Sequence, residues 1–438
     1  MSKIWIKNCI IVAMEKSIFD SGPLYYVGDI TIEDNLLRSV GCETIEGFQA
    51  DTIIDGSKFV ALPGFINAHT HAAMTIFRSF ADDLPLMTWL QEKIWPAEDK
   101  LTKEDVYWGS KLCILEMLLS GTTTFADMYS FMPEVAKAVD ETGIRACLSR
   151  GLIGTGPNAE QGLLEGEELV KNWHGKANGR ITAMFGPHAT YTCPPEYLND
   201  VLALARQYHV GMHIHVAETS GEFKDIQKKY GKTPVGYLNS LGFFDCPTLA
   251  AHCVHLSGED IEILHEKNVA VAHNPESNMK LASGVAPVPN MLDKGITVAL
   301  GTDGASSNNN LDMLEEMRSA ALLHKVAGDP TVIYSYQALE MATKNGAKAL
   351  GLENKIGMLK PGMAADLILV DFEKPHLYPK HDILAHLVYS AQSSDIDTVI
   401  VDGKILVRSG KPVTIDSKET CAQVQRIADR ITGNPDSR

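Results

Sequence analysis

The chain is poor in paired cysteines and long apolar runs. Its eight cysteines include no Cys-x-x-Cys pair, which argues against a zinc ribbon or a thioredoxin-like motif. In a chain of 438 residues they are typical of reduced, mostly buried thiols. No uncharged apolar run reaches the roughly 18–20 residues that a membrane span needs. The N-terminus also lacks the apolar core and cleavage site of a signal peptide. We therefore expect a cytoplasmic protein with no membrane partner.

Positive charge is also scarce, because the formal net charge is −16. Nucleic-acid binding needs a basic surface, so this balance argues against a nucleic-acid partner. The Gly-rich patterns that hold the phosphates of nucleotide cofactors are absent as well. We expect a small-molecule substrate and no nicotinamide, flavin or nucleotide cofactor.

What the chain does contain is a series of short apolar runs that alternate with amphipathic helical stretches such as Lys103–Leu119 and Pro195–Tyr208. The eight runs are Phe59–Ile66, Thr122–Asp127, Ile144–Arg150, Ile181–His188, Val210–His215, Leu249–His252, Val269–His273 and Ile296–Gly301. Eight buried strands that alternate with helices over about 290 residues predict a (β/α)8 TIM-type barrel, an α/β fold.

Strand-like segments near both ends of the chain predict a second, smaller unit. These segments are Lys3–Val12, Val27–Glu33, Leu37–Gly41, Thr52–Asp55, Ile356–Gly362, Asp366–Asp371, Thr398–Asp402 and Lys404–Arg408. Short strands with Gly, Asn and Asp between them are typical of a small β-sheet. We expect one β-sandwich built from residues 1–58 and 353–412, around a catalytic barrel at 59–352. A C-terminal helix and polar tail should follow at 413–438.

The segment Pro63–His71 ends an apolar run with two histidines, His69 and His71. Residues i and i+2 of a strand point to the same face, so both rings can reach one metal ion. His215 and Asp303 close two further apolar runs, and barrel enzymes build their active sites at the C-terminal strand ends. Hydrolytic zinc sites take three or four N/O ligands and leave one position for water. These four residues predict such a site.

Two pairs of histidines leave alternatives open. His213 lies on the same face as His215, but His215 is nearer the strand end and three residues before Glu218, so we favour His215 as the ligand. His213 is then expected one layer deeper, in a structural role. We likewise favour His252 over His255, because His252 lies nearer the strand interior.

The expected number of metal ions follows from strand four. Its end, Phe185–His188, lacks the lysine that bridges two metals in many binuclear barrels, so the sequence favours one ion. Zinc is the expected metal, although iron and manganese accept such ligands too.

At this point the residues resemble the amidohydrolase superfamily, and within it the deaminases of 5′-methylthioadenosine and S-adenosylhomocysteine. The superfamily marks are Pro63–His71, His215–Glu218, Leu300–Gly304 and Ile356–Leu367. Narrower marks are Asp83–Leu90 and Ile94–Glu98, and His273–Leu281 is shared more widely among ring deaminases. The resemblance covers nearly the whole chain. It implies zinc-dependent hydrolytic deamination of the adenine 6-amino group of those two nucleosides, with adenosine as a third candidate.

The resemblance also implies roles for individual residues. Zinc would be bound by His69, His71, His215 and Asp303. The catalytic residues would be Glu218, His252 and Asp303, with Glu218 as the proton shuttle. Substrate contacts would come from Glu98 at the ribose hydroxyls, His188 at the purine, Arg150 at the far end of the substrate, and from Glu218 and Asp303. Arg78 and Ser306 are further pocket candidates without an assigned role.

Three rival functions stay open on the sequence alone. The first is another ring deaminase or chlorohydrolase of the same superfamily, acting on a guanine, pterin, cytosine or triazine; Glu98 favours a nucleoside instead. The second is a cyclic-amide hydrolase, disfavoured by the missing strand-four lysine. The third is a catalytically silent metal-binding protein, and Glu218 with His252 argues against it. The expected partner is a small purine nucleoside, and a homo-oligomer is suggested only by analogy with other barrels.

Overall fold

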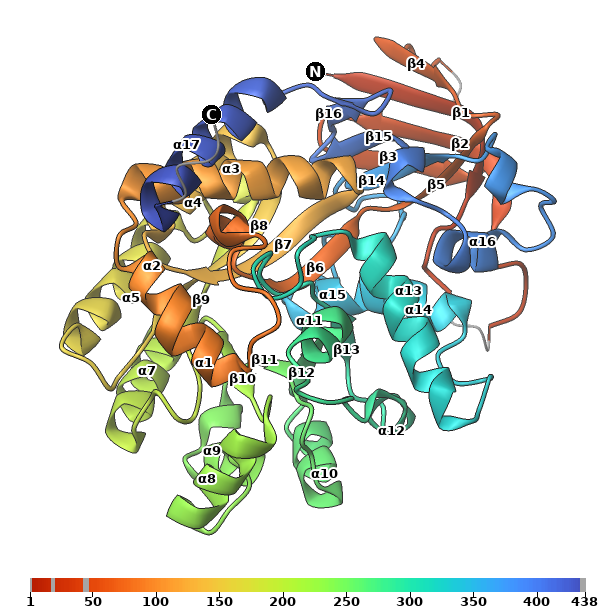
Figure 1. Cartoon of the computed structure of the whole chain (residues 1–438). Coiled ribbons are helices and arrows are strands. Elements are labelled where there is room, and N and C mark those ends of the chain that lie inside the picture. The colour runs from red at the N-terminus through yellow and green to blue at the C-terminus, as the bar shows by residue number, and fades with distance from the viewer. Residues whose placement is uncertain (1, 17–19, 42–46, 434–438) are drawn as a thin grey trace.

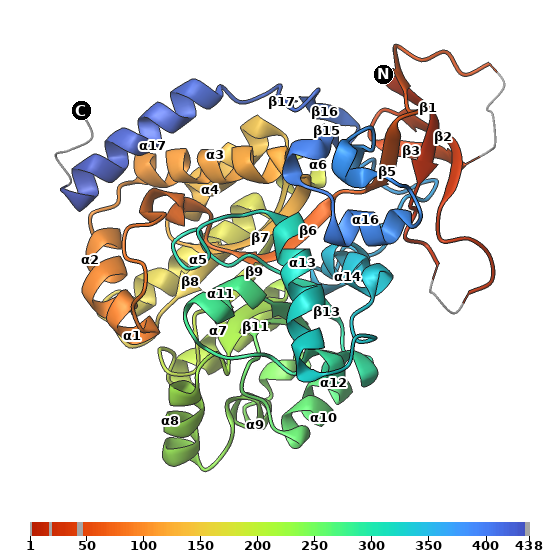
Figure 2. The same ribbon diagram turned by 45° about the vertical axis from the view of Figure 1, so that its right-hand side comes forward.

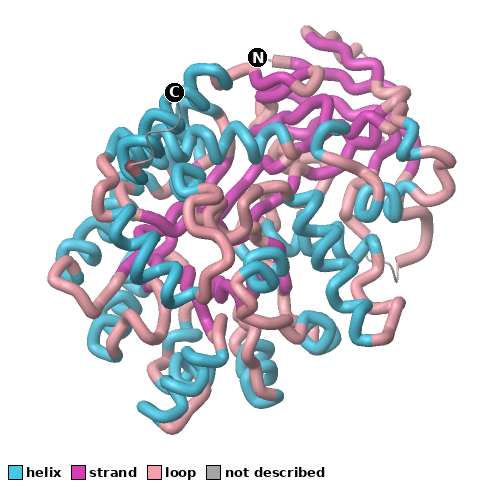
Figure 3. The backbone as a smooth tube through the Cα atoms, in the orientation of Figure 1, coloured by secondary structure: helices cyan, strands magenta, loops and turns pink. Residues whose placement is uncertain are grey.

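The computed structural model describes residues 2–16, 20–41 and 47–433 and contains two β-sheets (Figure 1). One is an eight-stranded parallel sheet in the order β13-β12-β11-β10-β9-β8-β7-β6. Its strands are β6 (Phe65–Thr70), β7 (Thr122–Tyr129), β8 (Arg145–Leu152), β9 (Ile181–Pro187), β10 (Met212–Val216), β11 (Thr248–His252), β12 (Ala270–His273) and β13 (Val298–Leu300). In Figure 3 these strands occupy the centre, and helices and loops surround them. The predicted barrel is confirmed.

The two outer strands of this sheet, β6 and β13, meet through hydrogen bonds of the residues that follow β13. The Asp303 amide donates to the His69 carbonyl at 3.0 Å, and the Asn67 side chain contacts the Thr302 amide and hydroxyl at 3.1 and 2.7 Å. The barrel is therefore joined at the strand ends that carry His69 and Asp303.

The second sheet combines strands from both ends of the chain, in the order β17-β16-β15-β14-β5-β1-β2-β3, with β4 paired to β1. Its N-terminal strands are β1 (Lys3–Ile11), β2 (Tyr26–Glu33), β3 (Leu36–Gly41), β4 (Thr52–Asp55) and β5 (Phe59–Pro63). Its C-terminal strands are β14 (Leu367–Asp371), β15 (Ile396–Val401), β16 (Lys404–Arg408) and β17 (Lys411–Pro412). Antiparallel pairing of β14 with β5 joins the two ends, which confirms the predicted terminal β unit.

Two predicted strands differ from the structure. The run Phe59–Ile66 is divided: β5 belongs to the terminal sheet and β6 to the barrel. Gly64 lies between the two strands. A Cβ at this position would lie only 2.1 Å from the Thr123 side chain, a clash that glycine avoids. Both halves are fully buried, so the apolar pattern could not reveal the change of sheet. Ile356–Gly362 forms turns instead of a strand, and Gly357 and Gly362 take positive φ angles of 91° and 89°.

Helices cover the outside of the barrel (Figures 1 and 2). They include α3 (Lys103–Leu119), α4 (Met132–Thr142), α5 (Ala159–Trp173), α7 (Pro195–Tyr208), α8 (Ser220–Tyr230), α10 (Gly258–Glu266) and α13 (Met313–Leu323). The short helix α11 (Pro275–Lys280) lies at the C-terminal end of the barrel instead, where Ser277 contacts Asp303. The C-terminal helix α17 (Ser417–Thr432) runs beside α3 in both views. The polar tail predicted after it falls on residues 434–438, outside the described residues. Within the described ranges, no helix combines the length and the apolar character required to cross a bilayer.

A buried ion cluster connects the barrel to the terminal sheet. Arg145, at the start of β8, is 1% exposed. Its Nε lies 2.7 Å from Asp366 Oδ2, and its Nη2 lies 3.0 Å from Asp366 Oδ1 and 3.4 Å from Asp402 Oδ1. A two-pronged guanidinium contact of this kind fixes orientation as well as distance. Arg145 thus sets how the start of β8 lies against the segments flanking β14 and β15.

We expect Arg145→Met to lower the free energy of unfolding by about 3–5 kcal/mol, because it leaves two buried carboxylates without their partner. Lys171→Met is the control: it breaks the pair with Glu167 at a side chain that is 49% exposed, and should cost less than about 1 kcal/mol. Urea unfolding followed by circular dichroism measures both. Equal losses in the two variants would contradict a special contribution from the buried cluster.

Candidate metal centre and active site

Polar side chains from four barrel strands meet at the C-terminal end of the barrel. His69 lies in β6 and His71 directly follows it. His215 lies in β10, His252 ends β11, and Asp303 follows β13. The parallel order of the strands brings these ends to one place, as in other barrels. The structure therefore brings the four predicted ligands and the favoured catalytic histidine together.

The nitrogen and oxygen atoms of this cluster lie close to one another. His71 Nε2 is 3.2 Å from Asp303 Oδ1, and His69 Nε2 is 3.4 Å from the same oxygen. His215 Nε2 is 3.4 Å from His71 Nε2. In two sets of residues the ligand atoms lie within 4.8 Å of one another. The first set is His69, His71 and Asp303, and the second is His69, His215 and His252. This spacing suits a single ion that several donors surround.

The groups behind the cluster fix which atoms face it. His71 Nδ1 lies 2.6 Å from the Met128 carbonyl, and His215 Nδ1 lies 2.6 Å from the His188 carbonyl. A carbonyl oxygen only accepts, so both rings carry a proton on Nδ1 and turn Nε2 towards the centre. Asp303 is held similarly, since the hydroxyls of Ser277 and Ser307 donate to its Oδ2 at 2.6 and 2.9 Å. Its Oδ1 is left facing His69 and His71.

Burial and mutual charge set the electrostatics of these groups. Burial lowers the pKa of His69 to about 4. Burial also opposes the charged form of His71, but the hydrogen bond and charge of Asp303 outweigh it and raise the pKa to about 9. The pKa of Asp303 is well below its usual range: burial works against this, and its contacts with the His69 and His71 rings overcome it. The Asp303 side chain therefore stays a carboxylate and offers a negative charge to a cation.

The residues present fit a metal ion. His69 Nε2 is fully buried and has no hydrogen-bond partner among the described residues. A buried nitrogen without a partner is unfavourable unless something else binds its lone pair. Three imidazoles and one carboxylate are also the ligand types that hydrolytic zinc sites use.

The backbone takes left-handed angles at three strand ends of the site, next to Glu218 and at His252 and Asp303. Ala217, directly before Glu218, has φ 51°, His252 has φ 73° and Asp303 has φ 60°. Such angles are unfavourable for residues with a Cβ and concentrate at functional sites. Burial raises the pKa of Glu218, which favours the protonated form of a carboxyl that could serve as a general acid. His252 Nδ1 lies 2.8 Å from Asn278 Oδ1, so its Nε2 faces the cluster.

Two of the predicted substrate-contacting residues lie near the cluster. The His188 ring is 4.9 Å from the His215 ring, centroid to centroid, and burial lowers the pKa of His188 to about 4, so the ring is neutral. Glu98 lies in α2 (Trp95–Glu98) and accepts a hydrogen bond from the Tyr129 hydroxyl at 2.6 Å. Tyr129 lies beside His71, with ring centroids 6.5 Å apart. Burial raises the pKa of Glu98 to about 7.

The remaining candidates make other contacts. Arg150 Nε pairs with Glu165 of α5 at 2.7 Å, and Arg78 pairs with Glu116 of α3. These arginines are engaged by outer helices in this structure. The Ser306 hydroxyl contacts the Met74 sulfur at 3.3 Å.

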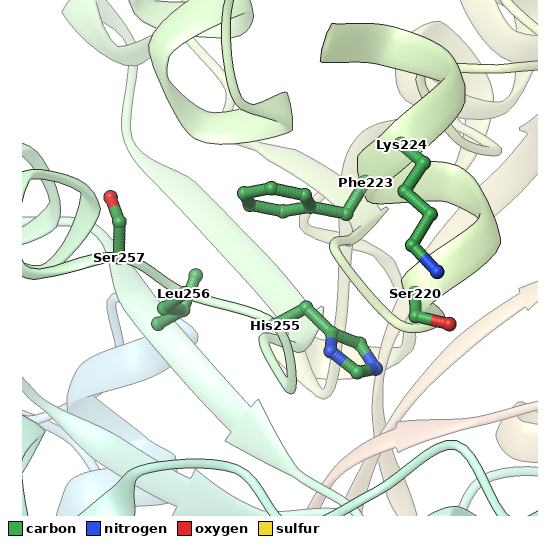
Figure 4. A pocket seen from close by; sticks show the side chains of 6 residues that line it. All are labelled: Ser220, Phe223, Lys224, His255, Leu256 and Ser257. Atoms are coloured by element: carbon green, nitrogen blue, oxygen red, sulfur yellow. The ribbon is translucent and has the colours of Figure 1, made fainter.

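His255, the alternative to His252, lies outside the cluster. Its Nε2 contacts the Ser283 carbonyl at 2.8 Å, and the Ser283 hydroxyl lies 3.5 Å from Glu218 Oε1. A pocket of about 350 Å³ opens beside His255 (Figure 4). Its walls are the start of α8 and the loop after β11, formed by Ser220, Phe223, Lys224, His255, Leu256 and Ser257. These walls follow Glu218 and His252 in the chain.

Some residues that hold the predicted ones in place were not predicted from the sequence. Tyr129 supports Glu98, and Glu222 accepts from the Glu218 amide at 2.9 Å and from the Thr190 hydroxyl at 2.6 Å. Thr219 to Glu222 has the Ser/Thr-x-x-Glu pattern of a helix start, and that pattern could have placed Glu222 at the first turn of α8. Tyr129 had no comparable signal, since Glu98 is distant in sequence.

Known proteins with this sequence pattern were found by comparison. Residues 60–406 match the amidohydrolase family. Over 436 residues the chain is 57% identical to a 5-methylthioadenosine/S-adenosylhomocysteine deaminase of Pelotomaculum thermopropionicum, covering 98% of this chain and 99% of the relative. It is 52% identical over 441 residues to a 5'-deoxyadenosine deaminase of Methanosarcina mazei, covering 100% of both. An adenosine deaminase structure from Xanthomonas campestris with bound zinc has a TM-score of 0.94 at 32% identity, covering 99% of both chains.

We expect Asp303→Asn to lose tight metal binding, because it removes the negative charge that the cluster offers to a cation. The affinity for the metal should fall by more than roughly 100-fold, because the loss of a residue that only supports a ligand already costs up to about that factor. Asp127→Asn is the matched control: Asp127 is also buried at a strand end, but its Oδ1 accepts from the Ala72 amide at 2.7 Å. Metal content after desalting, by atomic emission, measures both. Equal retention by the two variants would contradict Asp303 as a ligand.

Proposed function

The chain belongs to the amidohydrolase family, and on that premise we propose that it deaminates 5′-methylthioadenosine and S-adenosylhomocysteine. Hydrolysis at C6 of the adenine ring would release ammonia and leave the inosine analogue. The observation that carries the proposal is the location of Glu98. It provides a carboxyl for ribose hydroxyls beside Tyr129 and His71, at the same end of the barrel as the metal-binding cluster. Relatives named for this activity over nearly the full chain support it.

We propose one zinc ion per subunit, held by His69, His71, His215 and Asp303; iron or manganese would suit the same ligand types. The cluster of donor atoms and the zinc in a similar solved structure support this assignment. A bound zinc ion would supply the Lewis acidity that makes water nucleophilic near neutral pH.

Within this proposal the proton transfers belong to Glu218, His252 and Asp303. Glu218, whose pKa is raised by burial, gives a proton to the adenine N1. As a carboxylate it then helps pass to the leaving amine the proton that the attacking water has lost. His252 accepts at Nε2 and orients the attacking water, because Asn278 holds its Nδ1. Asp303 accepts the proton that this water loses.

The substrate would be held at three points. Glu98 accepts hydrogen bonds from the ribose hydroxyls, and His188 contacts the purine. Arg150 is proposed for the far end of the substrate, and binding there would require its guanidinium to share or exchange its contact with Glu165. The domain boundaries given above remain parts of this proposal except at residues 59–63, which form β5 of the terminal sheet. The cytoplasm as compartment and a homo-oligomeric assembly are proposed as well.

The test of the function is ammonia release by the zinc-loaded protein from a panel of six compounds: methylthioadenosine, adenosylhomocysteine, adenosine, adenine, guanine and cytosine. The proposal expects turnover of the adenosine derivatives, with the free bases inert. Turnover of a free base alone would contradict the nucleoside assignment. Silence across all six compounds would contradict the proposal as well, and chloride release from a triazine would then indicate the chlorohydrolase chemistry of another structural relative.

Glu218→Gln should keep the metal and lose turnover. Loss of a positioned general acid and base lowers the rate by about 10²–10⁴-fold. Glu315→Gln, a change in a different carboxyl on α13, serves as the control and should leave kcat unchanged. Steady-state kinetics with metal analysis of the same samples gives the answer. Full activity of Glu218→Gln would contradict the proposed proton shuttle.

Product binding should depend on the charge of Glu98. Its pKa is raised to about 7, so it gains a proton as the pH falls through that value and becomes a poorer acceptor for ribose hydroxyls. The Kd of the inosine product should therefore rise below about pH 7, approaching tenfold per pH unit, the limit for one proton. Calorimetric titration at several pH values measures it.

Two variants test whether Glu98 causes the pH dependence of the Kd. The Tyr129 hydrogen bond lowers the pKa of Glu98, so Tyr129→Phe should move the rise in Kd to higher pH. Glu98→Gln should remove the dependence. A rise in Kd that persists unchanged in Glu98→Gln would assign it to another group.

A further inference from the structure

Behind His69 lies a second buried histidine to which the function proposed above assigns no part. His213 lies on β10 one layer below His215 and is 1% exposed. Its Nε2 is 2.8 Å from His69 Nδ1, and its Nδ1 is 3.3 Å from the Ser149 hydroxyl on β8. The Ser149 hydroxyl in turn donates to the Asp127 carbonyl on β7 at 3.1 Å. Four side-by-side groups from β6, β10, β8 and β7 thus form one hydrogen-bonded row.

The direction of every proton in this row follows from its last member. The Asp127 carbonyl can only accept, so it takes the single Ser149 hydroxyl proton. Ser149 can then only accept from His213, which places the His213 proton on Nδ1. His213 Nε2 becomes an acceptor and takes a proton from His69 Nδ1. The only ring nitrogen of His69 left without a proton is Nε2, the buried atom that faces Asp303.

We propose that His213 is a positioning residue that holds His69 in its metal-binding tautomer, with Ser149 and the Asp127 carbonyl fixing His213. The inference rests on the proposed metal site. It differs from the arrangement at His71 and His215, where a backbone carbonyl does the same directly. A backbone carbonyl cannot be removed by a side-chain substitution, whereas His213, which supports His69, can be replaced.

The experiment measures zinc affinity by competition with a fluorescent chelator in variants of His213. His213→Phe keeps an aromatic ring but removes the acceptor. His213→Gln places an acceptor oxygen near the position of the histidine Nε2, and His213→Asn places one near Nδ1 instead. Loss of an outer-shell partner of a metal ligand weakens binding by about 10–100-fold. We expect that loss in His213→Phe and His213→Asn, and recovery of most of the affinity in His213→Gln.

Ser149→Ala extends the test without touching a histidine. It removes the acceptor for His213 Nδ1, frees that ring to change tautomer, and should weaken zinc binding by a smaller factor than His213→Phe. If His213→Phe does not fold, the comparison of Gln, Asn and Ser149→Ala decides alone. Zinc affinity within twofold of wild type in the folded variants, or Gln no better than Asn, would overturn the proposal. Because affinity is measured without turnover, this outcome is separate from failure of the deaminase assignment.

Discussion

The interaction on which the rest of the structure depends is the desolvated contact between Asp303 and the histidines of β6. Removing a carboxylate and several imidazoles from water is unfavourable unless each has a partner. Asp303 finds His69 and His71 on one side and the hydroxyls of Ser277 and Ser307 on the other. The same few atoms also join the first and last strands of the barrel, since the Asp303 amide bonds the His69 carbonyl. Two residues that close the barrel, His69 and Asp303, therefore also build the site.

The scaffold supports this contact from layers further out. Neighbouring strands supply carbonyls that orient His71 and His215, and the helix start after β10 supplies Glu222, which accepts from the Glu218 amide. The left-handed backbone at Ala217, His252 and Asp303 is tolerated because burial and hydrogen bonding on all sides over-determine it. At the opposite end of the barrel, Arg145 ties β8 to the terminal sheet. Rigid support of this kind is what positions proton-transfer groups accurately.

Much of the fold and of the site could be predicted from the sequence, for reasons that differ from residue to residue. The eight strands were predicted because burial on both faces makes each a continuous apolar run, and the strand ends followed from the histidines and acids that close the runs. The division of Phe59–Ile66 was not predicted, because β5 and β6 are equally buried and differ only in their pairing partners, β14 and β7, which are distant in sequence. Tyr129 and Ser149 were missed because their partners are distant in sequence. His213 was seen, but spacing alone could not show which groups its two nitrogens meet.

The most direct test of the account is the position and number of zinc ions in crystals of the protein, from anomalous scattering at the zinc edge. The account predicts one peak per subunit, in contact with His69 Nε2, His71 Nε2, His215 Nε2 and an oxygen of Asp303. Two peaks in the barrel, or a single peak away from His69 and Asp303, would contradict it.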